Sequence, residues 1–416
     1  MKHATPADYR KLLGTLKAGD TLQLAAGVYE RGLPVSDCHG RADAWITIQG
    51  PDSGVAEIRQ TQVANCVELR QCRFVALKRL SILGDGPDGI PGLAGISAKG
   101  GLENSVHHIL IEDCIIGGWS TSQQAVGIST KTPTWDWTIR RNLIRDCGTG
   151  LYLGNSDGTS PFIRGVIEHN LVENPIGYCM EIKYQKPRPD LLDMPTEASR
   201  TVIRHNVFIK NDAPSPNGDR PNVLVGGFPE GGPGSEDLYE IHGNFFWHNP
   251  RESLLQASGR VSIHDNLFHG CPTHAAITLR DHDLPLRLAH VYNNTIHSAV
   301  CGIRIANPAL ESHALVGNAV FADEPLALHR SITRVEANLT GSIAEASGHL
   351  ADPASLDFHP LPGCCEGPPL DLSAFQSDAA FDVDFDGTAK GDLCFRGAYV
   401  GPAKAGSWRP QRGMKP

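Results

Sequence analysis

The sequence predicts an all-β fold of the solenoid type, in which one chain winds through successive coils of short strands. Three observations point to this fold class. A short strand pattern that ends in asparagine recurs through the middle of the 416-residue chain. A second short apolar run follows each recurrence, with no helical periodicity between the two. The chain also has 44 glycines and 29 prolines but only 6% aromatic residues, which favours many turns over long helices.

The N-terminal segment is expected to form a capping helix. Residues 6–17 place Tyr9 and three leucines at helical spacing. The end strand of a solenoid needs such a cover, because an open edge pairs with other chains. The apolar runs at 19–32 and 44–51 are predicted to form the first coils.

The asparagine repeat indicates stacked coils with tight corners. Its shortest interval is 22 residues, from Asn244 to Asn266, and its longest is 38, from Asn206 to Asn244. Asparagine tolerates the left-handed backbone that a tight corner needs. Stacking would bring the side-chain amides into an internal ladder, each bonded to the next. A sandwich or barrel would instead place Asn-Gly or Asp-Gly turns between hairpin strands. The members are Asn142, Asn170, Asn206, Asn244, Asn266, Asn294 and Asn318, and Asp113 takes the same place upstream.

The C-terminal part of the chain loses this period. We therefore expect a solenoid with its cap over 1–325 and an irregular tail over 326–416 that packs on the coils. Within the tail, DVDFDGTAKGDL (382–393) begins like a calcium-binding loop. Leu393 stands where such a loop needs glutamate, and no helix pattern flanks it. A structural turn is the preferred interpretation, with calcium as the alternative.

Composition and missing motifs limit the function. The net charge of −9 argues against general binding of nucleic acid, and no apolar run is long enough to span a membrane. No glycine-rich phosphate loop supports a nucleotide cofactor. The eleven scattered cysteines are expected to be buried free thiols. The chain begins without an apolar leader segment. We expect a periplasmic or extracellular protein whose signal peptide is absent from this sequence, with a cytoplasmic protein as the alternative.

The second strands of the coils are predicted to carry a groove. When they are aligned, one outward column contains the cations Lys131, Lys183 and Arg280, separated by small residues. With strands about 4.8 Å apart, Lys131 would lie about 10 Å from Lys183, and Arg280 about 14 Å from Lys183. Such a groove suits an extended anionic chain, although cations kept on a solvated face are the alternative. The residues between the cations are Gly154, Gly226 and Ala257, and the neighbouring outward column contains Ser129, Tyr152, Glu181, Leu224, Leu255, Thr278 and Arg304.

Long insertions flank the same coils. Residues 186–199, 211–220 and 228–236 lengthen the two coils that follow Asn170 and Asn206. Insertions on adjacent coils often wall a single site, although variable surface loops are the alternative.

The run LKAGDTLQLAAGVYERGLPV…AWITIQGP, followed by the asparagine coils, resembles right-handed parallel β-helix carbohydrate-active proteins. It is most similar to the alginate lyase and chondroitinase B group of polysaccharide lyases. This resemblance implies an anionic, uronic-acid-containing polysaccharide or oligosaccharide as substrate. It also implies a catalytic lysine and arginine on neighbouring coils, with calcium held by acidic residues near the lysine. Glu181-Ile182-Lys183 and Thr278-Leu279-Arg280 are similar to those two strands, although here they lie three coils apart.

Cleavage of a uronate chain by β-elimination assigns roles to these residues. The substrate carboxylate must be neutralised, a base must remove the C5 proton, and an acid must assist the leaving oxygen. Lys183 is the expected base, because neighbouring cations can lower a lysine pKa. Arg280 or Lys131 would hold carboxylates, and Tyr152 or Tyr184 would be the acid. Further substrate contacts are expected from Gln185, Lys186, Arg204, His205, Lys210, Arg220 and Glu181, and Glu181 is also the candidate calcium ligand.

Other functions remain open at this stage. A glycoside hydrolase would need two carboxylates about 5–10 Å apart, and only Asp281 and Asp283 accompany Glu181. A C5-epimerase shares the proton abstraction of a lyase. A non-catalytic carbohydrate-binding or surface module would need a groove without a base. His169 and His205 precede ladder asparagines on consecutive coils and are a minor candidate for a metal pair.

Overall fold

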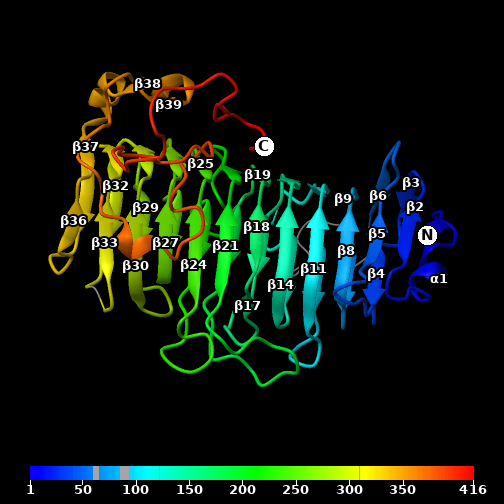
Figure 1. Cartoon of the computed structure of the whole chain (residues 1–416). Helices are drawn as coiled ribbons and strands as arrows, with labels where there is room; N and C mark the ends of the chain where they lie inside the picture. The colour runs from blue at the N-terminus through cyan, green and yellow to red at the C-terminus, as the bar shows by residue number, and fades with distance from the viewer. Residues whose placement is uncertain (60–64, 85–92, 121, 309) are drawn as a thin grey trace.

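The computed structural model describes residues 1–59, 65–84, 93–120, 122–308 and 310–416. It confirms the predicted fold class, because the chain forms a parallel β-helix built from three long parallel sheets (Figure 1). Each coil contributes one short strand to each sheet in turn, and we number the sheets 1, 2 and 3 in the order in which a coil visits them. Their inward side chains fill one continuous core along the axis of the helix.

Sheet 1 pairs its strands in register from coil to coil. Its inward column includes isoleucines and a valine that are fully buried, such as Ile139, Ile167, Ile203 and Val291. The strands are β1 (Lys2–Ala4), β2 (Thr21–Leu24), β5 (Ile46–Gln49), β8 (Arg73–Lys78), β11 (Val106–Glu112), β14 (Thr134–Arg140), β18 (Val166–Glu168), β21 (Arg200–Arg204), β24 (Leu238–His242), β27 (Gly259–His264), β30 (Leu286–Tyr292), β33 (His313–Val316) and β36 (Arg334–Glu336), with β17 (Phe162–Ile163) beside β14.

Sheets 2 and 3 complete each coil. Sheet 2 consists of β3 (Gly27–Tyr29), β6 (Ala56–Ile58), β9 (Ser81–Leu83), β12 (Ile115–Gly117), β15 (Leu143–Arg145), β19 (Leu171–Glu173), β22 (Val207–Ile209), β25 (Phe245–Trp247), β28 (Leu267–His269), β31 (Thr295–His297), β34 (Ala319–Phe321) and β37 (Leu339–Gly341). Sheet 3 consists of β4 (Leu33–Ser36), β7 (Val67–Arg70), β10 (Ala94–Lys99), β13 (Val126–Lys131), β16 (Thr149–Leu153), β20 (Met180–Ile182), β23 (Val223–Val225), β26 (Leu255–Ala257), β29 (Ala275–Leu279), β32 (Cys301–Ile305) and β35 (Glu324–Leu328).

The asparagine ladder forms at the corner between sheets 1 and 2, as predicted. The Asn206 Oδ1 accepts from the backbone N–H of Asn170 at 3.0 Å and from its side-chain amide at 2.9 Å. The same pair of bonds repeats along the corner and continues to Asn338, which the sequence pattern missed. Each amide thereby satisfies buried backbone groups without water.

Two details of the predicted corner were wrong. Cys114, not Asp113, occupies the first ladder position, because its N–H donates to the Asn142 Oδ1 at 2.9 Å. The left-handed conformation belongs to the residue before each asparagine, whose side chain points outward while the asparagine packs inside. These corner residues include Arg141, His169, His205, Asp265 and Asn293.

The N-terminal cap is shorter than expected. Instead of a helix over 6–17, the structure has the five-residue α1 (Tyr9–Leu13). Two of its side chains, Tyr9 and Leu13, are buried against the first coils. The edge of sheet 1 is formed by β1, which precedes the helix and pairs with β2.

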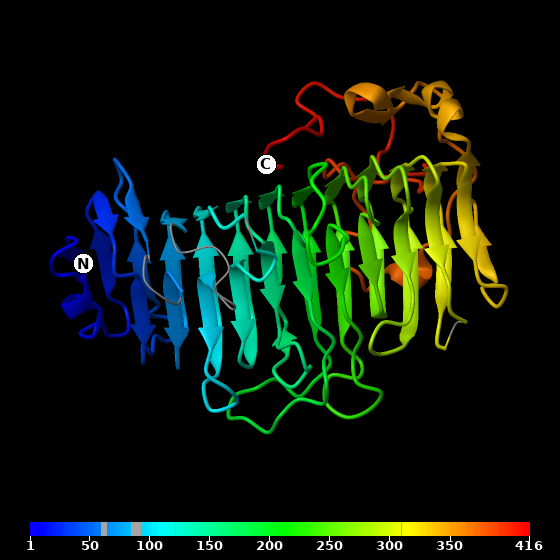
Figure 2. The same ribbon diagram turned by 180° about the vertical axis from the view of Figure 1, so that it is seen from behind.

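The stacking of coils continues beyond the expected boundary at residue 325. The strands β35, β36 and β37 add to their sheets in parallel, so the last coil ends at Gly341. The tail then folds back along the coils, and its C-terminal end lies beside their middle (Figures 1 and 2). It contains η1 (Ile343–Gly348), β38 (Leu350–Asp352), η2 (Pro353–Ser355), β39 (Asp357–Pro360) and η3 (Ser373–Phe375).

The tail covers parts of the outer faces of sheets 1 and 2. Phe375 stacks on Tyr292 of sheet 1 with ring centroids 4.3 Å apart. Phe358 packs against the outward residue Phe245 of sheet 2. The calcium-like segment is the predicted structural turn, because the Asp384 carboxylate accepts backbone N–H groups of the tail itself.

All eleven cysteines are free thiols, as expected, and only Cys364 and Cys394 are partly exposed. In the described part of the chain, no helix has the length and apolar character needed to cross a membrane.

Candidate functional site

The predicted cation column is present on the outer face of sheet 3. Lys131 ends β13, Lys183 follows β20 and Arg280 follows β29. The backbone N–H groups of Lys183 and Arg280 continue the sheet bonding, donating to Leu153 O and Ala257 O. Towards the N-terminal end, Lys99 pairs directly with Lys131 across neighbouring strands.

The predicted register of the coil that contains β26 was wrong by one residue. Val223 pairs with Leu255, so the outward residue beside Thr278 is Gln256 and not Leu255. Ser258 therefore stands in the cation column where Ala257 was expected. The error arose because Leu254 and Leu255 are both apolar, so alternation alone does not determine which of them points inward.

Lys183 forms an ion pair with Glu181 from the same strand. The Lys183 Nζ lies 3.1 Å from the Glu181 Oε1, and both side chains are largely buried. Burial raises the pKa of Glu181, and the ammonium of Lys183 opposes that rise.

A turn over 281–285 covers the gap between Lys183 and Arg280. The backbone carbonyl of His282 accepts from the Ser258 hydroxyl at 3.4 Å, and Pro285 O accepts from Gly259 N–H at 3.1 Å. The turn thus contacts the coil of β26, one of the two coils that separate the two cations. Burial lowers the pKa of His282. The Asp283 carboxylate, 3.9 Å from its Nε2, opposes this, and the positive charges of Lys183, Arg280 and Arg220 lower the pKa further. His282 is therefore neutral near pH 7.

Tyr152 lies on β16, between the strands that lead to Lys131 and Lys183. The Lys131 ammonium stands 5.5 Å from its ring centroid. Burial raises the pKa of Tyr152, as do the charges of Glu181, Asp157 and Asp283. The phenol therefore keeps its proton at neutral pH. Tyr184 lies to one side, with the Lys183 ammonium 5.7 Å from its ring.

Tyr178 and Arg220 approach from the opposite edge of sheet 3. The Arg220 guanidinium lies 5.8 Å from the Tyr178 ring centroid. Burial raises the pKa of Tyr178, with a further rise from Glu181. Within the described residues, no carboxylate lies within ion-pair distance of Lys131, Arg220 or Arg280.

The three insertions border this face. Residues 211–220 join sheet 2 to sheet 3 and carry Arg220, whereas 186–199 and 228–236 leave sheet 3 for sheet 1. The latter two belong to the green loops that project below β18, β21 and β24 in Figure 1. A buried ion pair between Arg188 and Asp237 ties them together.

Several predicted substrate contacts lie elsewhere. The Gln185 side chain is buried and bonds Phe162 O and the Tyr239 hydroxyl. The Lys210 ammonium is buried and donates to Arg220 O at 2.9 Å, so it supports Arg220 rather than facing the groove. Lys186 is exposed beside the site.

Arg204 and His205 do not face the groove. They lie at the corner of sheets 1 and 2, where Arg204 pairs with Glu168 at 2.7 Å and His205 bonds Lys415 of the tail. The inclusion of both in the site was wrong, because residues next to ladder asparagines point away from sheet 3. His169 and His205 stack with centroids 5.0 Å apart.

Calcium does not fit the residues present. The Glu181 carboxylate is engaged by the Lys183 ammonium. In the described ranges, no group of three His, Cys, Asp or Glu side chains is arranged to hold a metal ion.

Sequence reasoning missed Tyr178 and His282. His282 lies two residues after Arg280, but only the backward turn of the chain brings it near Lys183. Tyr178 precedes β20 in a connection whose path is not visible in the strand pattern.

No protein-family model and no curated protein matches the chain. Among solved structures, an alginate lyase from a Paenibacillus species is 12% identical, covering 82% of this chain and 98% of its own, with a TM-score of 0.45. The A-module of a mannuronan C-5 epimerase from Azotobacter vinelandii is 15% identical, covering 77% and 91%, with a TM-score of 0.49. A pectate lyase is 10% identical, covering 85% and 84%, with a TM-score of 0.48. A shared scaffold at this distance does not determine the activity.

Proposed function

We propose that the protein is a polysaccharide lyase that cleaves an anionic, uronic-acid-containing polysaccharide by β-elimination on the outer face of sheet 3. The observation that carries this proposal is the unpaired cation set Lys131, Arg220 and Arg280 around a protonated Tyr152 and a neutral His282. A periplasmic or extracellular location remains a prediction that goes with this substrate.

The cations would bind and neutralise the carboxylates of the chain. Arg280 can hold a carboxylate through two parallel hydrogen bonds. Neutralisation makes the C5 proton more acidic, because it stabilises the enolate-like charge that develops when the proton leaves. Lys99 and Lys131 extend this positive column towards the N-terminal end.

We assign His282 as the base in place of Lys183. The sequence suggested Lys183, but its Nζ lies in an ion pair 3.1 Å from the Glu181 Oε1. Lys183 then neutralises charge at the reacting sugar. His282 takes the C5 proton, the C5–H electrons form the C4=C5 double bond, and the C4–O bond breaks. Tyr152 gives its proton to the leaving oxygen, since its raised pKa keeps the phenol protonated.

The test is incubation with a panel of uronate polysaccharides, with reducing ends and ultraviolet absorbance of the new double bond measured together. The proposal expects both signals to rise in parallel on at least one polymer. Reducing ends without absorbance would mean hydrolysis, exchange of the C5 proton without cleavage would mean epimerisation, and neither would mean a binding module. Each of these three results would contradict the proposal.

The base is tested by comparing His282→Asn with Lys183→Met. If His282 is the base, His282→Asn loses most of its activity. The residual activity of this variant then no longer shows the decline at acid pH that the wild type shows. A Lys183 base would instead leave that decline in place in His282→Asn. Lys11→Met is the matched control, because Lys11 is exposed on α1 at the N-terminal end of the coils.

A further inference from the structure

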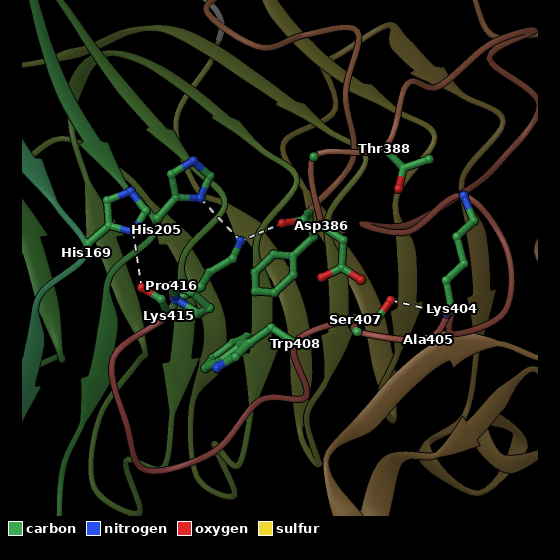
Figure 3. A pocket seen from close by; sticks show the side chains of 13 residues that line it. His169, His205, Asp386, Thr388, Lys404, Ala405, Ser407, Trp408, Lys415 and Pro416 are labelled. Atoms are coloured by element: carbon green, nitrogen blue, oxygen red, sulfur yellow. Dashed lines mark hydrogen bonds between the residues drawn. The ribbon is translucent and has the colours of Figure 1, made fainter.

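A cavity of about 520 Å³ lies beneath the C-terminal tail, at the corner of sheets 1 and 2 and away from the sheet 3 groove. Its walls are the corner residues His169 and His205 together with tail residues 385–388, 404–408 and 415–416. Figure 3 shows the two imidazoles at one end and Lys404 at the other, with Asp386 and Trp408 between them. This volume is in the range of small-molecule sites.

The cavity is built around a buried lysine and a histidine. The Lys415 amino group donates to Gly243 O at 3.1 Å and to Phe385 O, and it bonds the His205 Nδ1 at 3.2 Å. Burial lowers the pKa of Lys415 to about 7. The charged form of Lys415 can only donate, and with it the His205 Nδ1 accepts and the ring proton is on Nε2. His169 donates from Nδ1 to Lys415 O at 3.1 Å, which fixes the partner ring as well.

The wall also contains an acceptor. The Asp386 Oδ2 bonds the His359 Nε2 at 3.2 Å. The Ser407 oxygen accepts from the Lys404 N–H at 3.2 Å. A carboxylate has about four acceptor sites, so Asp386 keeps capacity for ligand hydroxyls.

Three side-chain donors that line the cavity have no protein partner among the described residues. Over the described residues, the Lys404 ammonium has no carboxylate within ion-pair distance and the Trp408 indole N–H has no acceptor within hydrogen-bond distance. The His205 Nε2–H likewise bonds no protein acceptor there. Spare donors and a free cation select a ligand that carries an anionic acceptor.

The aromatic wall sets the shape of that ligand. Trp408 is half-buried, and its ring lies 6.0 Å from that of the buried Phe385. A half-exposed indole offers a flat apolar surface with a polar edge. A bare inorganic anion would leave most of this cavity unfilled.

We propose that this cavity binds a small carboxylate-bearing sugar, whose ring lies on Trp408 and whose carboxylate meets Lys404. The site is separate from the groove on sheet 3 and does not depend on catalysis there.

The test is titration of the full chain with glucuronate by calorimetry, with glucose and inorganic phosphate as comparison ligands. The proposal expects saturable binding of glucuronate, with glucose and phosphate at least about tenfold weaker. Lys404→Met and Trp408→Leu should each weaken glucuronate binding by about tenfold or more. The control Lys11→Met, at an exposed lysine of α1, should bind like the wild type. In Lys183→Met any binding of glucuronate by the sheet 3 groove is weakened, so the binding that persists belongs to the cavity.

Absence of glucuronate binding at about 10 mM would overturn the proposal. Loss of binding in Lys183→Met with retention in Lys404→Met would place the ligand in the groove and also overturn it. If phosphate binds as tightly as glucuronate, the cavity is a simple anion site, and the proposal of a sugar ligand is contradicted. If Trp408→Leu does not fold, as judged by circular dichroism, Lys404→Met decides alone.

Discussion

The outer faces of sheet 1 and sheet 3 both carry charged side chains but arrange them differently. On sheet 1, Arg204 pairs with Glu168 at 2.7 Å and Arg200 pairs with Glu240 at 3.0 Å. The tail adds Asp378, which pairs with Arg200 at 3.1 Å. On sheet 3, Lys131 and Arg280 face solvent without a carboxylate partner among the described residues.

We infer from this difference that the outer face of sheet 1 has a structural role, whereas the outer face of sheet 3 binds a ligand. Like charges directly opposite on neighbouring strands are unfavourable, as for Lys99 and Lys131. Paired charges on sheet 1 dock the tail, so their loss should affect stability. Unpaired cations on sheet 3 lower stability unless an anion binds, so their loss should affect activity.

The largest expected effect is on catalysis at sheet 3. Lys183→Met and Arg280→Met should each lower kcat/KM by about 100-fold or more, because each removes positive charge from the reacting carboxylate. Thermal unfolding should change little for Arg280→Met, since Arg280 is exposed. Arg204→Met, the matched substitution on sheet 1, should keep kcat/KM within about twofold. Equal losses in Arg280→Met and Arg204→Met would contradict the distinction between the faces.

The next effect is on the stability of sheet 1. Asp378 is buried and accepts from Arg200, the Ser262 hydroxyl and the Tyr292 hydroxyl. Asp378→Ala should lower the free energy of unfolding by about 3 kcal/mol, because it leaves these buried donors without a partner. Urea unfolding measures this, with exposed Asp371→Ala as the control. A cost near zero would mean that the tail is not held through this carboxylate.

Acid should act on the stability of sheet 1 through its buried histidines. Burial lowers the pKa of His264 to about 3, with Lys390 adding to the shift. Between the ordinary histidine pKa and this value, the unfolded chain binds more protons than the folded one. Stability from this group is therefore complete above about pH 6.5 and is lost as the pH falls towards 3.

The variant His264→Phe tests this directly, because it keeps a ring to stack on Tyr292, 4.6 Å away. The stability of the variant, measured by urea unfolding across pH, should fall less steeply in acid than that of the wild type. Identical slopes would rule out His264 as a source of the acid sensitivity.

At the groove, the pKa of His282 is also lowered, first by burial and then by Lys183 and Arg280. Because His282 is the proposed base, its lowered pKa should affect the pH dependence of the catalytic rate. Activity should stay constant as the pH falls through the ordinary histidine range and decline only below it, where His282 gains a proton. Initial rates across pH measure this, and a midpoint above the ordinary histidine pKa would exclude His282 as the base.

The smallest expected effect is that of calcium removal. Since Glu181 is engaged by Lys183, chelation by EDTA should leave kcat/KM within about twofold. A tenfold loss that added calcium restores would show that a metal site forms when substrate binds.

Period-two alternation and the asparagine repeat were sufficient to predict the coils, the ladder and the cation column. They failed where local patterns are degenerate. At β26 the register could not be assigned correctly, because two adjacent leucines both fit the inward position. The further coil that ends at Gly341 was not recognised, because its sequence is rich in Pro and Ala. Arg204 and His205 were misplaced because their outward direction at the corner depends on the left-handed backbone of His205. His282 needed a turn that folds back over Ser258, a tertiary contact that no periodicity encodes.

The central claim is that the unpaired cations of sheet 3 recognise carboxylates on the chain that is cleaved. The most direct measurement uses a uronate polymer that the protein cleaves and compares it with the same polymer after its carboxylates are reduced to alcohols. Ultraviolet absorbance and reducing ends are followed on both. The account predicts parallel signals on the native polymer and neither signal on the reduced one. Equal release of reducing ends from both polymers would contradict it.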